Sequence, residues 1–202
     1  ADRAEFLADP DFVQVPVLQL LNPKYLEKRR NEIPNHRARK MQEVSASKNN
    51  FVEPDHTTHF TLMDQAGNVI TSTQTINGYF GSHLVIPNTG VILNNEMDDF
   101  AIKPGVANLF GAVASDKNSV QPMKTPLSSM SPTIVMKKNQ PVLALGSPSG
   151  TRILTCVASV ILNYLEFKMP LYQAVATIRY HHQWTPDVLR VDEPGFPEST
   201  EQ

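Results

Sequence analysis

A threonine follows a histidine at positions 56 and 57, where a polar segment gives way to a β-prone one. A threonine hydroxyl needs a base to become a nucleophile, and the α-amine of a chain-terminal threonine can serve as that base. The α-amine titrates close to neutral pH, which suits proton transfer. This chemistry requires a cut between His56 and Thr57. Taken alone, the position is better explained as an ordinary strand threonine, because threonine is common in strands.

Polar residues also stand close together downstream, at Glu96 and Asp99 and at Ser128 and Ser129. Taken alone, these positions are better explained by ordinary roles, because Asp residues cap turns and Ser residues are common in loops.

Two neighbouring histidines raise the question of a metal site. Adjacent residues such as His181 and His182 cannot easily converge on one ion, and beyond Asp187 there is no further partner at ligand spacing. We therefore expect structural roles for them, with no metal and no cofactor. The single cysteine, Cys156, lies in an apolar helix-like run and is predicted to be a buried structural thiol.

The composition limits the classes of protein to which the chain can belong. The chain has 202 residues, of which 41% are hydrophobic and 19% charged, enough for a packed core in about one domain. Its net charge of -2 lacks the basic excess of a nucleic-acid or membrane-surface binder, so we expect no nucleic-acid partner. No apolar stretch reaches the roughly 18 residues that a membrane span needs.

Three regions are predicted along the chain: helix-compatible residues 1–33, a flexible polar linker over 34–56, and a catalytic domain over 57–202. Alternating β-prone residues predict two hairpins, and apolar residues at helical spacing predict a helix. The region from 86 to 132 is rich in Gly, Pro, Asn and Ser and is expected to be irregular. The predicted elements are strands at 57–63 and 69–76, strands at 133–136 and 141–145, and helices at 153–164 and 171–179.

The ordered motifs after residue 56 resemble the small subunit of γ-glutamyltransferases. Residues 1–3 and 9–13 resemble the end of that family's large subunit, so the resemblance covers nearly the whole chain, with the linker least similar. The motifs are TTHF at 57–60, TIN at 75–77, FGS at 80–82, NNEMDDF at 94–100, KPGV at 103–106, PLSSMSP at 126–132, GSP at 146–148 and RYHHQW at 179–184.

The resemblance implies an α+β fold, the αββα sandwich of N-terminal-nucleophile (Ntn) hydrolases, of which this chain would be the catalytic half. It also implies autocatalytic cleavage at His56–Thr57. The expected reaction transfers a γ-glutamyl group from glutathione or a related donor to water, an amino acid or a peptide. Residues 1–33 would be the tail of a large subunit whose missing portion is the expected partner, and family members are periplasmic or secreted.

Roles can be carried over residue by residue. Thr57 would be the nucleophile, and Thr75 would hydrogen-bond and orient it. The donor's glutamyl head would be held by Asn77, Glu96 and Asp99, and its α-carboxylate by Ser128 and Ser129. The backbone amides of Ser149 and Gly150 would form the oxyanion hole.

The sequence departs from the family pattern in several places. Ser149 stands where the family usually has glycine, which costs strain if the position needs a positive φ. Thr125 stands where arginine is frequent, and Phe110 where some members have a lid tyrosine. If the His56–Thr57 bond is intact, the α-amine is an amide and the chain is an unprocessed precursor.

Two alternatives to the glutathione reaction stay open. One is a related Ntn acylase that acts on cephalosporin side chains or poly-γ-glutamate. The acidic pair Glu96 and Asp99 favours a substrate with a free α-ammonium, and hence the first hypothesis. The other is a truncated or inactive homologue that acts only by binding, which Ser149 and the missing large-subunit portion motivate.

Overall fold

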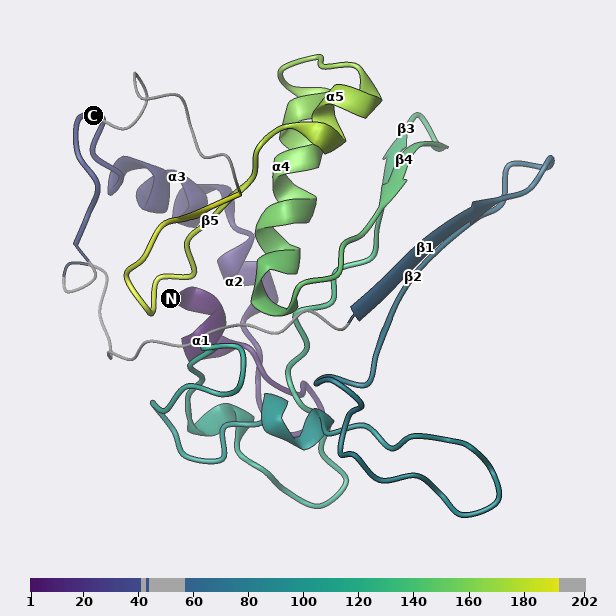
Figure 1. The fold of residues 1–202 in the computed structure, drawn as a ribbon. Helices are drawn as coiled ribbons and strands as arrows, with labels where there is room; N and C mark the ends of the chain where they lie inside the picture. The colour runs from purple at the N-terminus through teal and green to yellow at the C-terminus, as the bar shows by residue number, and fades with distance from the viewer. Residues whose placement is uncertain (41–42, 44–56, 193–202) are drawn as a thin grey trace. The chain divides into compact units, whose positions relative to one another are not determined.

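The computed structural model describes residues 1–40, 43 and 57–192 (Figure 1). The chain divides into two compact units. The first unit lies within Ala1–Phe51, Met97–Ser128 and Trp184–Asp187. The second lies within Val52–Glu96, Ser129–Gln183 and Val188–Gln202. Most of the predicted linker 34–56 lies outside the described residues, so the predicted three-region division stays a prediction.

The first unit contains short helices: α1 (Asp2–Phe6), α2 (Val17–Leu20) and α3 (Pro23–Asn31). The start of α3 is well specified, because the Asn22 side chain accepts a hydrogen bond from the Lys24 N–H and Pro23 fills the first helical position. Its last turn carries three basic side chains, which complement the helix dipole. These helices confirm the helical character predicted for residues 1–33.

Two antiparallel hairpins lie in the second unit and confirm the predicted ones. β1 (Thr57–Met63) pairs with β2 (Val69–Thr75), and β3 (Thr133–Lys137) pairs with β4 (Gln140–Leu145). The second turn is shorter than predicted, because Lys138 and Asn139 both adopt positive φ and close the hairpin in two residues.

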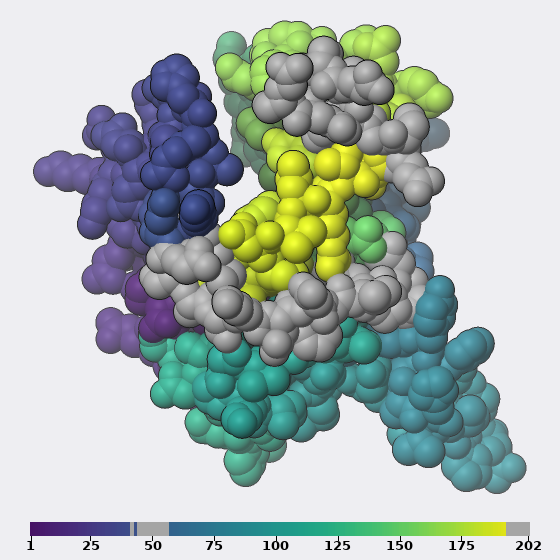
Figure 2. Space-filling model, turned by 60° about the vertical axis from the view of Figure 1, so that its left-hand side comes forward, coloured from purple at the N-terminus to yellow at the C-terminus, as the bar shows by residue number. Residues whose placement is uncertain are grey.

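The helix after the second hairpin is also confirmed. α4 (Ile153–Leu165) buries Ile153, Val157 and Val160 on one face, and α5 (Leu171–Ala176) contacts it. The prediction that the second helix continues to residue 179 is wrong, because Thr177 is already extended. The chain then enters β5 (Tyr180–His181), which contacts α4 and pairs with β6 (Arg190–Val191). The yellow segment that contains β5 reaches the molecular surface in Figure 2.

The region from 86 to 132 is irregular, as predicted. Its regular pieces are the single-turn 3₁₀ helices η2 (Glu96–Asp99) and η3 (Asp116–Asn118) and isolated bridges. The described residues form an α+β structure with three separate two-stranded sheets. In this described part of the chain, no helix is both long and apolar enough to span a membrane.

Candidate active site

The first hairpin places Thr57 directly opposite Thr75. The Oγ1 atom of Thr57 donates a hydrogen bond to Oγ1 of Thr75 at 3.3 Å. Thr57 is half-buried, so its hydroxyl is partly shielded from water and still accessible. His56, the other residue of the predicted cleavage site, lies outside the described residues.

The turn after β2 is fixed beside this threonine pair. Oγ1 of Thr75 also accepts the N–H of Asn77 at 2.9 Å. Asn77 is 3% exposed and adopts φ 73°, a conformation that Asn tolerates better than most residues. Its side-chain amide donates to the carbonyl of Asn95 at 3.3 Å, and Oδ1 of Asn95 accepts the N–H of Gly78 at 2.8 Å. Asn95, which the sequence analysis did not single out, therefore anchors this turn.

The face of the hairpin that carries Thr57 is polar over its first three residue pairs. Alternate strand residues share a face, so Thr57, His59 and Thr61 lie opposite Thr75, Thr73 and Thr71. Nδ1 of His59 lies 2.9 Å from the Thr73 hydroxyl, and Nε2 lies 3.1 Å from the Thr71 hydroxyl. Burial lowers the pKa of His59, which favours the neutral ring.

The second hairpin delivers the predicted oxyanion segment to this face. The Thr71 hydroxyl donates to the carbonyl of Leu145, at the end of β4, at 3.4 Å. The next residue is Gly146, and a Cβ built there would lie 2.2 Å from Cε1 and Nδ1 of His59. Only glycine fits against the imidazole ring at this distance. The segment that leads to Ser149 and Gly150 therefore starts in contact with the face that carries Thr57.

Ser149 and Gly150 form a left-handed turn immediately before α4. Ser149 has φ 100° and ψ 41°, and Gly150 has φ 52°. The turn continues as η4 (Gly150–Arg152), with the Arg152 N–H donating to the Ser149 carbonyl at 2.9 Å. The first N–H groups of a helical turn lack intrahelical acceptors and favour negative charge. Ser149 therefore has the positive φ at which a serine costs more strain than a glycine.

The predicted donor-binding residues are divided between the two units. Glu96 and Asp99 occupy the two ends of η2, and Glu96 belongs to the second unit with Thr57. Asp99 belongs to the first unit, where its Oδ1 accepts from Nδ2 of Asn108 at 3.2 Å. Ser128 and Ser129 likewise end one unit and begin a segment of the other. Their convergence on Thr57 stays a prediction.

The two histidines of the C-terminal motif differ in burial, because His181 is buried and His182 is exposed. His181 is 5% exposed, and its ring nitrogens contact the side chains of Thr155 and Gln183. Among the described residues, no group of His, Cys, Asp or Glu is arranged to hold a metal ion. Cys156 is half-buried rather than buried, because it lies beside the apolar stripe of α4; burial still raises its pKa.

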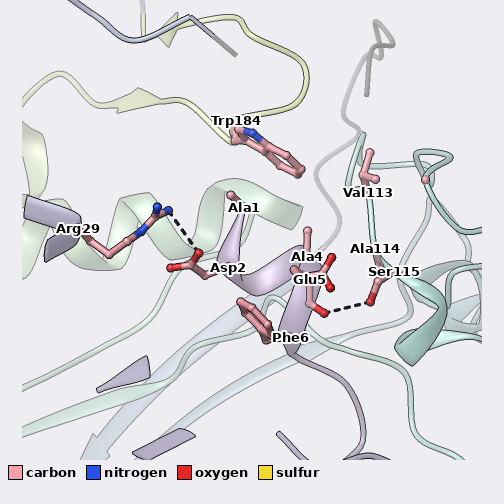
Figure 3. A pocket seen from close by; sticks show the side chains of 11 residues that line it. Ala1, Asp2, Ala4, Glu5, Phe6, Arg29, Val113, Ala114, Ser115 and Trp184 are labelled. Atoms are coloured by element: carbon pink, nitrogen blue, oxygen red, sulfur yellow. Dashed lines mark hydrogen bonds and ion pairs between the residues drawn. The ribbon is translucent and has the colours of Figure 1, made fainter. Parts of the chain in front are cut away.

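A cavity of about 440 Å³ lies in the first unit. Its wall contains the Arg29–Asp2 ion pair at 3.2 Å and the indole of Trp184 (Figure 3). Ser115 donates to the Glu5 carbonyl at 3.2 Å on another side. Of the described residues that line it, none carries a predicted catalytic or substrate-binding role.

Known proteins with similar sequences belong to one family. The family model for γ-glutamyltranspeptidase matches residues 1–202. The glutathione hydrolase proenzyme of Escherichia coli is 44% identical over 200 residues, covering 99% of this chain and 34% of that protein. The Pseudomonas aeruginosa proenzyme is 46% identical over 186 residues, covering 92% of this chain and 33% of that protein.

A solved structure agrees with these sequence relatives. The crystal structure of a threonine-to-alanine mutant of Helicobacter pylori γ-glutamyltranspeptidase is 48% identical, with a TM-score of 0.70. The match covers 71% of this chain and 77% of that chain. The fold is thus that of an Ntn hydrolase, as predicted. The chain belongs to the γ-glutamyltranspeptidase family, and it spans about a third of the length of the two proenzymes.

Proposed function

We propose that this chain carries the nucleophile of a γ-glutamyl transferase and hydrolase that acts on glutathione and related donors. The observation that carries the proposal is the 3.3 Å hydrogen bond between the hydroxyls of Thr57 and Thr75. It holds the Thr57 oxygen on a strand that would become the start of a subunit after a cut at His56–Thr57. Membership of the family supports the same reaction.

The proposed reaction runs in two halves. Oγ1 of Thr57 attacks the γ-carbonyl carbon of the donor and gives its proton to its own α-amine, which the cut has freed. The oxyanion of the tetrahedral intermediate accepts hydrogen bonds from the amides of Ser149 and Gly150. Collapse breaks the amide bond, and the leaving amine takes the proton. Water, an amino acid or a peptide then attacks the γ-glutamyl ester and releases Thr57.

Donor recognition is proposed from residue chemistry and from the family resemblance. Glu96 and Asp99 supply negative charge for the α-ammonium, and the hydroxyls of Ser128 and Ser129 supply donors for the α-carboxylate. The Asp99 carboxylate accepts a hydrogen bond from Nδ2 of Asn108 at 3.2 Å, which helps to fix its orientation.

The missing portion of a large subunit is the proposed partner. The chain matches only about a third of the length of its proenzyme relatives. The first hairpin has a second face, which points away from the Thr57 side chain and carries Phe60, Leu62 and Ile70. Leu62 and Ile70 are 60% and 61% exposed. Apolar side chains on such a face require a further layer to cover them, which supports a partner that completes the sandwich.

Mass spectrometry and hydrolysis assays of the full-length protein test the function. We expect a fragment that begins at Thr57 and hydrolysis of a γ-glutamyl anilide. Thr57→Ala should abolish both cleavage and hydrolysis, because one hydroxyl serves both, whereas Thr57→Ser should retain part of each. Normal cleavage in Thr57→Ala would exclude Thr57 as the nucleophile.

Two comparisons separate the alternatives. Preference for a glutaryl anilide over the γ-glutamyl anilide would indicate an acylase, since the glutaryl group lacks the α-ammonium that Glu96 and Asp99 are proposed to bind. An intact chain without hydrolysis after days of incubation would support a homologue that acts only by binding. The strained backbone at Ser149 is the observation that favours the homologue that acts only by binding.

A further inference from the structure

The left-handed turn at Ser149 and Gly150 is closed by a ring of contacts that reaches into the C-terminal motif. The Arg152 N–H donates to the Ser149 carbonyl, and the Thr155 hydroxyl donates to the Arg152 carbonyl at 3.0 Å. Oγ1 of Thr155 lies 2.8 Å from Nδ1 of His181. These contacts connect the turn to β5 through the first turn of α4.

The ring returns to the turn from the other side. Nε2 of His181 lies 2.8 Å from Oε1 of Gln183, and that oxygen accepts a hydrogen bond from the Thr151 hydroxyl at 2.6 Å. Thr151 directly follows Gly150 in the chain. We call Thr151, Thr155, His181 and Gln183 the His181 cluster.

We propose that the His181 cluster is a positioning device for the oxyanion hole, so that residues remote from the substrate fix the direction of the Ser149 and Gly150 amides. This inference rests on the proposed function, which assigns those amides to the oxyanion. The cluster itself touches neither the nucleophile nor its partner hydroxyl in any contact described above. Its effect on the reaction therefore passes through the backbone of the turn.

Burial makes the cluster stiff. Thr151 is 7% exposed and His181 is 5% exposed. A buried polar group that loses its partner costs free energy, so each member holds the others in one arrangement. Movement of the Thr151 hydroxyl away from Gln183 would break the 2.6 Å hydrogen bond between them. The peptide unit that joins Gly150 to Thr151 is held by the same constraint.

The turn needs such support because its backbone is strained. A non-glycine residue at φ 100° persists only where the surrounding structure over-determines it. On its upstream side the segment is held by the contact of Gly146 with the His59 ring. On its downstream side the His181 cluster supplies the matching restraint, so the turn cannot relax in either direction.

The consequence for catalysis follows from the precision that oxyanion donors require. Such donors must lie within about 0.5 Å of the productive geometry. A misplacement of about 1 Å can lower a rate about 100-fold. Loosening the cluster should thus weaken the binding of the tetrahedral intermediate more than the binding of the ground-state donor.

The test uses Thr151→Val in the full-length, processed protein, because valine keeps the shape of threonine and removes the hydroxyl. We expect kcat for γ-glutamyl anilide hydrolysis to fall about 10- to 100-fold, with KM changed by less than about threefold. Thr151→Ser restores the hydroxyl and should recover most of kcat. The matched control is Thr177→Val, which removes a hydroxyl bonded to the Gln173 carbonyl at 2.7 Å on an exposed helix end.

A second readout separates positioning from a general loss of structure. A boronic acid analogue of the γ-glutamyl group forms a tetrahedral adduct with a nucleophilic hydroxyl and imitates the intermediate. Its affinity should fall in Thr151→Val by about the same factor as kcat, and it should be unchanged in Thr177→Val. If Thr151→Val fails to fold, Gln183→Met breaks the same link at a less buried residue and gives the same comparison.

Each outcome decides the matter. An active wild-type protein whose Thr151→Val and Gln183→Met variants keep both kcat and boronate affinity overturns the positioning role alone. A rise in KM with unchanged kcat also overturns it, because that pattern reports uniform binding. Wild-type protein with neither cleavage nor hydrolysis overturns the proposed function instead, and the positioning role with it.

Discussion

Ser149 holds a backbone conformation that glycine adopts more easily, and this makes Ser149→Gly a sensitive test of the site. The residue has φ 100° and ψ 41°, beyond the small left-handed region that ordinary residues visit. Removing its Cβ should relieve strain in the turn that carries the proposed oxyanion amides. We therefore expect Ser149→Gly to stabilise the protein, although most substitutions destabilise.

The magnitude can be worked out from two opposing effects. A non-glycine residue in such a region costs about 1–3 kcal/mol in the folded state. Glycine loses about 0.5–1 kcal/mol more conformational entropy on folding than a residue with a side chain. The net expectation is a gain of about 0–2.5 kcal/mol in the free energy of unfolding, with a midpoint of about 1 kcal/mol. For a chain of this size, each kcal/mol corresponds to about 2–4 °C in Tm.

Urea and thermal unfolding of matched variants measure this difference. The control is Ser149→Ala, which removes the hydroxyl but keeps the Cβ and therefore keeps the strain. Ser149→Gly should be more stable than both the wild type and Ser149→Ala, and its kcat should not fall. Equal stability of the glycine and alanine variants would refute the reasoning, because the gain could not then come from φ.

Three further outcomes follow from the hairpin contacts. Thr75→Val should lower kcat about 10- to 100-fold in anilide hydrolysis, because Thr57 loses its oriented partner; Thr75→Ser should retain most activity. Gly146→Ala should lower the free energy of unfolding by about 1–3 kcal/mol in urea titrations, because its Cβ overlaps the His59 ring. Burial lowers the pKa of His59, so its stabilisation is complete above about pH 6.5 and is lost as pH falls through the lower folded-state pKa. The free energy of unfolding, measured between pH 7 and 5, should therefore fall less steeply with decreasing pH for His59→Asn than for the wild type.

Local sequence patterns predicted most of the second unit. The β-prone runs at 57–63 and 69–76, separated by a turn, predicted the hairpin, and the apolar spacing from Ile153 to Tyr164 predicted α4. These features depend on short-range physics, namely strand pleating, turn chemistry and a buried helix face. The end of α5 was missed because the chain turns extended at Thr177 to reach the β5–β6 pair, which no local pattern marks.

The supporting residues of the site were harder to predict. His59 stands two residues from Thr57 in a strand, so alternation alone places it on the same face. Its contact with Gly146 joins segments far apart in the sequence, and only the folded arrangement reveals it. Asn95 lies within the NNEMDDF motif but was assigned no role from the sequence, although it fixes the backbone beside Asn77.

The pairing of Thr57 with Thr75 depends on the opposite end of the hairpin. Side chains alternate between faces, so a slip of one residue would turn one of the two hydroxyls away from the other. The register is set at the turn, where the Asp64 carboxylate accepts the backbone N–H of Asn68 at 2.8 Å and its side-chain amide at 2.7 Å. The position of the Thr57 hydroxyl, the proposed nucleophile, is thus specified by polar contacts at the turn. The segment that leads to the proposed oxyanion hole contacts the same face through Gly146 and His59, so one β-hairpin positions both parts of the proposed chemistry.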